Sequence, residues 1–509
     1  MASSAPAPPP ADISTDYLII GAGIAGLGFA DELLTRTSAT ITIVDKRDAP
    51  GGHWNDAYSF VKLHGPANMY GVESTALSDD HIEQHGLNKG MMTLSSGPEI
   101  LAYCSRIVET RFLASGRVTY LPSTEYVESE GTVRGLFSWK RQTVKAKKIV
   151  DARYCENSIP LTHKPSFSTA PSVHCIPPNG LPRAAAGFQH FTVLGAGKTA
   201  VDACIWLLTN GVDAQRVRWI VPNDYWYLNR AKSQVAMPFF DDITTAIIDR
   251  FEAMAEATDA LDLARRLEKC EAWLRVDTAV EPLQFHSAVI SKGEMAELRK
   301  IRDVVRKGYV SAIQADKVVL TQGTIPAPLN TLYVDCTACA FPGSPPVPIF
   351  QHNKIVLQIV RSAMPGLSVA LIAFIEFLGL SDEERNDLVK PVPYAKGIQD
   401  YLTELSVDVR NSFHLSKFQP TREWSAQSRL DVFSSLVTRV PPEDVEKREK
   451  LARLMKVVPV GIGSDRIRKA SKPAVKNLKG MTSGRIQIVE IILMSIMLDP
   501  YSGYAIDQK

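Results

Sequence analysis

Two short glycine-rich runs are the residues most able to do chemistry in this chain of 509 residues. They are Gly21 to Gly26 and Gly195 to Ala200, and each directly follows an apolar run. A glycine turn between a strand and a helix presents backbone N–H groups and the positive end of the helix dipole to a dinucleotide pyrophosphate. The two runs therefore predict two dinucleotide sites, an arrangement suited to electron transfer between bound nucleotides.

The first run has every feature of a dinucleotide site. Gly21 permits the tight turn, Gly23 lets the backbone approach the pyrophosphate, and Gly26 lets helix and strand pack closely. Asp45 closes the next expected strand, where its carboxylate can accept hydrogen bonds from ribose hydroxyls. We expect these four residues to bind one nucleotide.

The second run keeps Gly195 and Gly197 but ends in Ala200, a variant that suits a helix standing slightly farther from its strand. The next strand ends without the carboxylate that selects NADH, and Arg230 and Lys232 come after it. Arg230 is the expected partner of a 2′-phosphate, which favours NADPH. The alternative is that both are solvated surface charges.

The elements that would hold these residues follow a strand–helix–strand order around each run. The expected ranges are 17–20, 24–34 and 41–44 around the first run, and 191–194, 199–210 and 217–221 around the second. This pattern predicts an α/β fold with two Rossmann-like dinucleotide-binding domains, a helical insertion and a mainly helical C-terminal region.

The expected domains follow from these elements and from a proline-rich connector before residue 190. They are a disordered tail at 1–15, the first part of the first nucleotide domain at 16–185, the second nucleotide domain at 186–330, a return to the first domain at 331–380, and the helical region at 381–509. A helical insertion at about 241–306, with apolar residues at spacings of three and four, would cover a substrate.

Composition narrows the classes of partner. The 57 Lys and Arg residues nearly balance the 55 Asp and Glu residues, so no overall field attracts nucleic acid or an anionic membrane. The most apolar stretches, 367–380 and 486–498, are shorter than the ~20 residues that span a bilayer, so we expect buried helices. Seven scattered cysteines favour a reducing compartment, with the cytoplasm as the default location.

A double glycine and an aromatic residue, at Gly51, Gly52 and Trp54, come shortly after Asp45. With the first glycine run, this segment resembles the flavin-containing monooxygenase and Baeyer–Villiger group, and more loosely the pyridine nucleotide-disulfide oxidoreductase superfamily, over roughly residues 16–360. The resemblance implies that the first nucleotide is FAD and that the loop of Gly52 and Trp54 passes beside its isoalloxazine ring.

Two further segments resemble parts of that family. The segment 63–68, with His64, is similar to one that lines the flavin pocket, although a polar loop is the alternative. The run 332–337 is similar to the late strand that returns to the flavin domain, which implies that Asp335 approaches the ribityl-phosphate region. The monooxygenase fingerprint expected between the two glycine runs has no match in residues 151–194.

These observations predict an FAD-dependent, NADPH-using oxidoreductase, with a monooxygenase of a small organic molecule, possibly a secondary metabolite, as the leading hypothesis and molecular oxygen as co-substrate. No catalytic residue and no metal site are assigned. One alternative is a flavin-linked dithiol oxidoreductase or dehydrogenase, since Cys336 and Cys339 have the spacing of redox dithiols. Another is a nonenzymatic nucleotide-sensing module whose C-terminal helices bind a partner.

Overall fold

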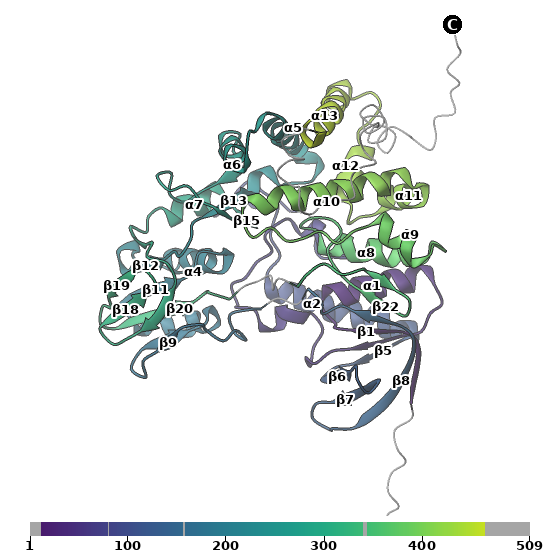
Figure 1. Cartoon of the computed structure of the whole chain (residues 1–509), viewed down its shortest axis with the longest axis horizontal. Helices are drawn as coiled ribbons and strands as arrows, with labels where there is room; N and C mark the ends of the chain where they lie inside the picture. Colours follow the sequence, from purple (N-terminus) through teal and green to yellow (C-terminus); the bar gives the residue numbers. More distant parts are fainter. Residues whose placement is uncertain (1–11, 80, 156–157, 339–343, 464–509) are drawn as a thin grey trace, which may run out of the picture.

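The computed structural model of the chain describes residues 12–79, 81–155, 158–338 and 344–463. Two sheets with parallel cores, each flanked by helices, lie side by side, and a layer of helices crosses above them (Figure 1). The α/β fold with two Rossmann-like units is confirmed.

The first sheet is centred on β1 (Ile13–Ile20), which pairs in parallel with β2 (Ile41–Val44) and with β8 (Arg141–Asp151). β5 (Val118–Leu121) pairs in parallel with β2. Leu18 and Ile19 are fully buried, one on each face, as expected of a parallel strand with both faces covered. This sheet places the first glycine turn at the carboxyl end of its central strand, where such sheets bind ligands.

The edges of the first sheet are formed by later strands. β22 (Lys354–Val356) pairs in parallel with β8, and β21 (Phe350–Gln351) lies antiparallel beside it. The hairpin of β6 (Thr124–Val127) and β7 (Thr132–Gly135) extends the start of β8. The chain therefore returns to the first unit through β21 and β22.

Three helices belong to the first unit: α1 (Ile24–Arg36), α2 (Gly97–Ile107) and α8 (Pro365–Glu376). Helices α1 and α8 pack so closely that a Cβ at Gly28 would lie 2.7 Å from Val369 Cγ2. Helix α8 covers most of the apolar stretch 367–380, and its residues are almost all buried. The prediction of a buried helix there is confirmed, whereas 486–498 lies outside the described residues.

The second sheet has five parallel strands in the order β10-β20-β11-β12-β16. Their bounds are β10 (His174–Ile176), β20 (Thr331–Asp335), β11 (His190–Leu194), β12 (Val217–Ile220) and β16 (Asp303–Val305). Its helices are α3 (Leu181–Ala184), α4 (Lys198–Thr209) and α7 (Lys292–Leu298). Helix α4 follows the second glycine turn, as predicted.

Strand β20 corrects the prediction made for Asp335. Its residues pair in parallel with β11 and β10, so it is a central strand of the second sheet and not the return to the first. Asp335 stands opposite Leu194, beside the second glycine turn, and therefore belongs to the second unit and not to the first, which it was predicted to join. A five-residue strand with an apolar centre fits either sheet, and only its distant pairing partners decide between them.

The domain boundaries shift for the same reason. The second unit already includes β10, before the expected start at residue 186, and the return to the first unit begins near residue 350, not at 331. Strand β1 begins at Ile13, inside the predicted tail, and residues 1–11 lie outside the described residues.

The remaining strands of the described residues form three small sheets. β13 (Tyr225–Asn229) lies between β14 (Trp273–Leu274) and β15 (Gln284–Ile290). β9 (Ser168–Thr169), β17 (Val310–Ile313), β18 (Lys317–Leu320) and β19 (Gly323–Pro326) form the second, and β3 (Gly71–Val72) and β4 (Thr75–Ala76) the third. Because β14 and β15 fall within 241–306, the predicted insertion is helical only in part.

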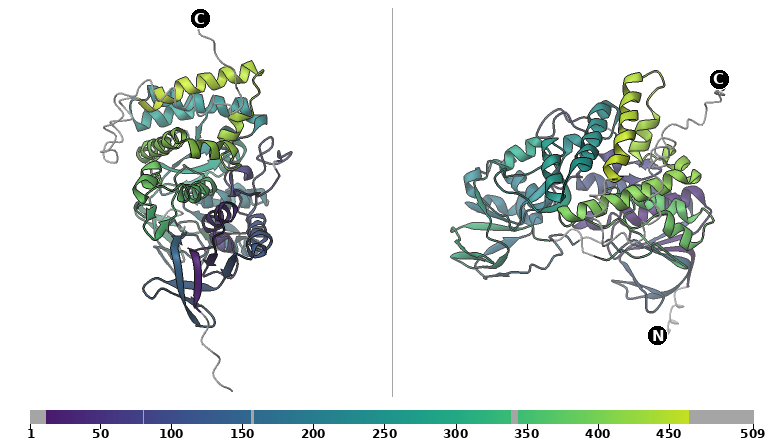
Figure 2. Two further views of the ribbon diagram at one scale, coloured as in Figure 1. Left: turned by 90° about the vertical axis from the view of Figure 1, so that its right-hand side faces the viewer. Right: turned by 45° about the horizontal axis from the view of Figure 1, so that its top comes forward.

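The helical layer joins two separate parts of the sequence. α5 (Phe240–Glu256) and α6 (Ala260–Lys269) come from the insertion, and α13 (Val445–Gly463) lies along α5 at the top (Figures 1 and 2). The other helices of this region are α9 (Asp382–Leu388), α10 (Ile398–Lys417), α11 (Gln419–Gln427) and α12 (Val432–Thr438). The C-terminal region is thus mainly helical as far as it is described.

None of the helices in the described part of the chain is long and apolar enough to cross a bilayer.

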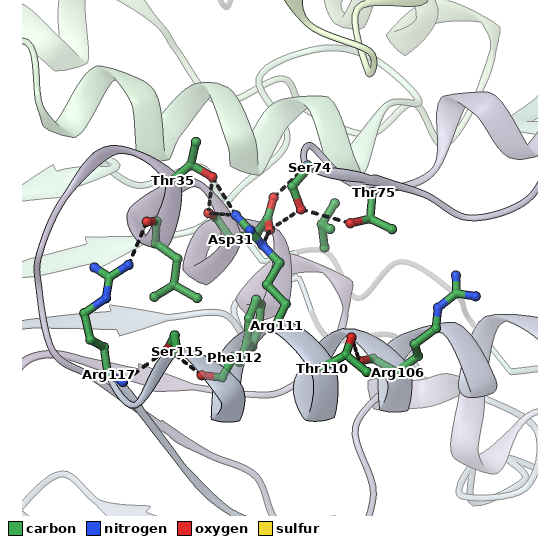
Figure 3. A network of polar contacts seen from close by, with 12 residues as sticks. Asp31, Thr35, Ser74, Thr75, Arg106, Thr110, Arg111, Phe112, Ser115 and Arg117 are labelled. Carbon is green, nitrogen blue, oxygen red and sulfur yellow. Dashed lines mark hydrogen bonds and ion pairs between the residues drawn. The ribbon is translucent and has the colours of Figure 1, made fainter.

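A buried ion pair fixes α1 against its neighbours (Figure 3). Asp31 is fully buried on α1, pairs with Arg111, and accepts hydrogen bonds from the Ser74 hydroxyl at 2.6 Å and the Ser74 N–H at 2.9 Å. Arg111 also donates to Thr35 Oγ1 at 2.7 Å. The carboxylate therefore connects three segments of the first unit and holds the helix that follows the first glycine turn.

We expect Arg111→Met to lower the free energy of unfolding by about 3 kcal/mol, because it leaves the Asp31 carboxylate buried without its counter-charge. Urea unfolding monitored by circular dichroism measures the change. Arg106→Met, at an exposed position in α2, is the matched control and should change it by about 0.5 kcal/mol or less. Equal losses in the two variants would contradict a structural role for the pair.

Candidate functional site

Both glycine turns open into one cavity of about 1880 Å³ between the two units and the helical layer. Most of the predicted site residues line it: Gly21, Gly23, Asp45, Gly52, Trp54, His64, Gly195 and Gly197. Gly26 and Ala200 pack behind the turns, and Arg230 and Asp335 are not part of the wall. A pocket for one drug-sized ligand is ~300–1,000 Å³, so this cavity has room for more than one ligand.

The first turn is held by approaches that only glycine permits. Gly21 has a φ of +110°, in the region that disfavours other residues. A Cβ at Gly26 would lie 1.9 Å from the carbonyl oxygen of Gly21. The roles predicted for these two glycines agree with this geometry.

The loop of Gly52 lies directly over this turn. A Cβ at Gly52, whose φ is +57°, would lie 2.9 Å from the Cα of Gly23. Asp45 Oδ2 accepts a hydrogen bond from the Ala22 N–H at 2.6 Å, and its Oδ1 accepts from the Arg47 N–H at 2.8 Å. The Asp45 carboxylate thus braces the turn while it lines the cavity.

Trp54 follows in the same loop and forms part of an aromatic wall. Its Nε1 donates to Tyr70 Oη at 2.8 Å, and its ring stacks on that of His53 at 5.2 Å. All three side chains line the cavity. The arrangement fixes the Trp54 ring through a hydrogen bond as well as packing.

His64 reaches the cavity from the segment after this loop. Desolvation at the cavity wall, together with the positive charges of Lys198 and Arg230, lowers the pKa of its imidazole. The ring is therefore neutral at physiological pH. Since Lys198 belongs to the second glycine turn, His64 lies near both glycine turns.

The second turn repeats the backbone geometry of the first. Gly195 has a φ of +109°, and a Cβ there would lie 2.8 Å from the carbonyl oxygen of Cys336. A Cβ at Gly197 would meet nothing within 4 Å, because this residue faces the open cavity. Ala200 is fully buried, consistent with its predicted place between helix and strand.

A polar contact that the sequence analysis missed joins the two units. Lys198 pairs with Asp202 one turn later on α4, and Tyr58 Oη of the first unit donates to Asp202 Oδ2 at 2.7 Å. Lys198 and Tyr58 both line the cavity. The sequence signal was a Lys within the second glycine run followed by an Asp four residues later, a spacing that favours contact on one helix face.

Arg230 corrects a second prediction. It is fully buried, its Nη2 donates to Glu294 Oε2 at 2.9 Å, and its Nη1 donates to the His64 carbonyl. A guanidinium already held by a buried carboxylate and a carbonyl is not open to a 2′-phosphate. Sequence position alone could not reveal the pairing, since Glu294 lies on α7, far along the chain.

The structure shows different groups at the end of β12. Asp224 forms a two-bond ion pair with Arg306, at 2.8 and 3.1 Å. Asn223 Nδ2 donates to Tyr309 Oη at 2.8 Å, and both of these side chains line the cavity. The carboxylate of this loop is therefore paired with a cation of the chain, and Arg306 also pairs with Asp277 at 3.3 Å.

The loop before α8 was also missed. Arg361, Met364 and Pro365 line the cavity, and a Cβ at Gly366 would lie 2.7 Å from the carbonyl oxygen of Gly71. The sequence signal for this loop was the proline and glycine directly before the apolar stretch, since proline is common at the first position of a helix.

Comparisons with known proteins agree with this geometry at the level of family and fold. Residues 19–79 match the family model described as an NAD(P)-binding Rossmann-like domain. The chain is 36% identical over 429 residues to the uncharacterized proteins Rv2000 of Mycobacterium tuberculosis and Mb2023 of Mycobacterium bovis, covering 84% of this chain and 80% of each relative. The chain belongs to the family of these mycobacterial proteins.

Solved structures of two monooxygenases are similar to this chain at lower sequence identity. Cyclohexanone monooxygenase from Rhodococcus sp. Phi1 bound to NADP+ has a TM-score of 0.47 and 16% identity, over 74% of this chain and 84% of its own. Oxidized steroid monooxygenase bound to NADP has a TM-score of 0.47 and 15% identity, over 71% and 84%. At these levels neither cofactor nor substrate carries over to this chain.

We expect Arg230→Met to destabilise the protein by about 3 kcal/mol, because it leaves the Glu294 carboxylate buried and unpaired. Adding Glu294→Gln should recover part of the loss, and chemical denaturation of the single and double variants measures the coupling. Nucleotide preference is a second measurement: the ratio of the KM for NADPH to the KM for NADH should stay as in the wild type. A rise in this ratio without loss of stability would indicate that Arg230 does bind the 2′-phosphate.

Proposed function

We propose that the protein is an FAD-dependent oxidoreductase that uses NADPH, and that it acts as a monooxygenase on a small organic molecule. The observation that carries the proposal is that both glycine turns, each at the carboxyl end of a parallel strand, face the same cavity. Two dinucleotides bound there would extend toward one another.

The first turn fits FAD. The backbone approaches at Gly26 and Gly52 leave the N-terminus of α1 bare of side chains, so its unpaired N–H groups can meet a pyrophosphate. Asp45 lines the cavity where ribose hydroxyls would donate to its carboxylate. FAD, when bound, accepts a hydride from the nicotinamide and passes its electrons to oxygen.

The second turn fits a nicotinamide nucleotide that enters and leaves. The open space at Gly197 allows close approach of a pyrophosphate, and Lys198 adds a positive charge at the same turn. Pairing of Asp224 with Arg306 lessens the negative charge that would repel a 2′-phosphate, although Arg306 also pairs with Asp277. These features support NADPH as the reductant.

The rest of the cavity wall supports oxygen chemistry on an enclosed substrate. Helices α5, α10, α12 and α13 contribute residues to the cavity wall, which would help to exclude water from the reacting groups. The neutral His64 ring and the fixed Trp54 ring can orient bound groups without transferring protons. No side chain is required as a general acid or base.

The dithiol alternative has less support. Cys336 is buried, and burial raises the pKa of its thiol well above the usual value, which disfavours the thiolate that dithiol exchange needs. Cys339 lies outside the described residues.

Two glycine variants test the nucleotide sites separately. Gly23→Ala should weaken FAD retention. The added Cβ would lie at an ordinary 3.5 Å from the nearest protein atom, so the fold tolerates it, but it would occupy space that a pyrophosphate needs at the turn. Gly197→Val should retain FAD and stability but raise the KM for NADPH by about tenfold or more. The FAD content is measured by absorbance after heat extraction. The oxidation of NADPH, which gives up about one hydride per turnover, is followed by its absorbance.

Wild-type protein provides the decisive controls. A colourless protein that takes up no FAD on reconstitution would overturn the proposal. A yellow protein that binds NADPH but never reduces its flavin would point to the nucleotide-sensing alternative. Rapid mixing of the reduced enzyme with oxygen then separates the oxygen outcomes, since immediate release of hydrogen peroxide indicates an oxidase.

A further inference from the structure

We propose that the part of the cavity beneath the helical layer binds a substrate with an apolar body and one carboxylate, and that Arg250 is the residue that binds this carboxylate. The inference rests on the proposed function, since it names the class of substrate for the same cavity. It is carried by the place of Arg250, by its hydrogen-bond partner, and by the chemistry of the wall around it.

Arg250 lies in the middle of the cavity-facing side of α5. Ile243, Ile247, Arg250 and Met254 follow one another at spacings of four, three and four, so they share one helix face, and all four line the cavity. The guanidinium is thus the one charged group in an otherwise apolar stripe of this helix. Arg250 is partly buried, so its charge is not simply solvated outside.

The chain supplies Arg250 with a neutral partner and no counter-ion. The hydroxyl of Tyr401, on α10, is within hydrogen-bonding reach of the guanidinium. Within the described ranges, no carboxylate oxygen lies within 4.0 Å of the Arg250 nitrogens. A cation facing an apolar cavity without a counter-ion favours an anion, and the planar guanidinium suits a carboxylate with two oxygens.

Acidic groups that line this part of the cavity have partners other than Arg250. Asp408 pairs with Arg361 at 3.1 Å. Glu404 accepts hydrogen bonds from Ser362 Oγ and from the Ala395 N–H, and burial raises its pKa, which favours the neutral form. Asp431, which also lines the cavity, accepts a hydrogen bond from the Ser434 N–H at 3.2 Å. None of these three carboxylates forms an ion pair with Arg250 in the described part of the chain.

The surrounding wall is suited to a hydrocarbon body. Apolar side chains with part of their surface still accessible line it from four helices and one strand. They are Leu228 of β13, Ile247 of α5, Leu405 of α10, Phe433 of α12 and Val458 of α13. Because the same cavity reaches the glycine turns, a molecule anchored at Arg250 would extend toward the nucleotide sites.

Binding of a fluorescent probe tests the inference on the purified full chain. The probe is dansylaminoundecanoic acid, and its methyl ester is the uncharged comparison. We expect the wild type to bind the acid about tenfold or more tightly than the ester. Arg250→Met should remove this preference by weakening the acid alone, and Arg250→Lys should restore part of it, because a charge without the planar fork remains.

Arg453→Met is the matched control. Arg453 lies on the adjacent helix α13, is 62% exposed, and pairs with Glu252 at 2.8 Å outside the cavity wall. It should bind acid and ester as the wild type does. Circular dichroism and urea unfolding confirm that each variant is folded.

Three results would overturn the inference: no binding of the acid by the wild type, equal binding of acid and ester, or a loss in Arg250→Met that is the same for both. These results leave the proposed function standing if the protein holds FAD and oxidises NADPH. Conversely, charge-dependent binding of the acid by a chain that takes up no FAD would refute the proposed function and retain Arg250 as an anion site.

Discussion

The architecture depends on backbone approaches at the first turn that leave no room for a Cβ atom. The contact of Gly26 with Gly21 sets α1 against β1, and the contact of Gly52 with Gly23 brings the next loop over the start of that helix. Neither approach is stable by itself, since glycine gives up more conformational freedom on folding than other residues. The Asp45 carboxylate at Ala22 and the Asp31–Arg111 pair behind α1 supply the compensating interactions.

The same loop then determines how the two units face each other. Tyr58 reaches Asp202 on α4, and the His64 carbonyl accepts from Arg230 of the second unit. Both contacts are formed by residues that come directly after the Gly52 turn. A change at the first turn would therefore reach the second turn through this loop, and the relative position of the two turns depends on these polar contacts.

The sequence could predict what local patterns determine. The glycine turns, the strand–helix–strand order around them and the buried helix α8 each depend on residues close together in the chain, so periodicity and turn chemistry were enough. Strand β20 could not be assigned in this way, because the sequence of a short strand does not indicate which sheet it joins. Asp335 was misplaced with it. The insertion was expected to be helical because α5 is strongly amphipathic, whereas β14 and β15 form only by pairing with β13.

Arg230 and Arg250 show why a basic residue near a nucleotide motif cannot be assigned from its position. Both follow the second βαβ unit, and nothing in their neighbours separates a structural cation from one that binds a ligand. The difference is whether the fold supplies a carboxylate. Arg230 forms an ion pair with Glu294 of α7, and its side chain does not line the cavity. Arg250 meets a tyrosine hydroxyl and an apolar wall instead. A partly buried positive charge without a counter-ion is a cost that folding alone does not explain, and a bound anion would offset it.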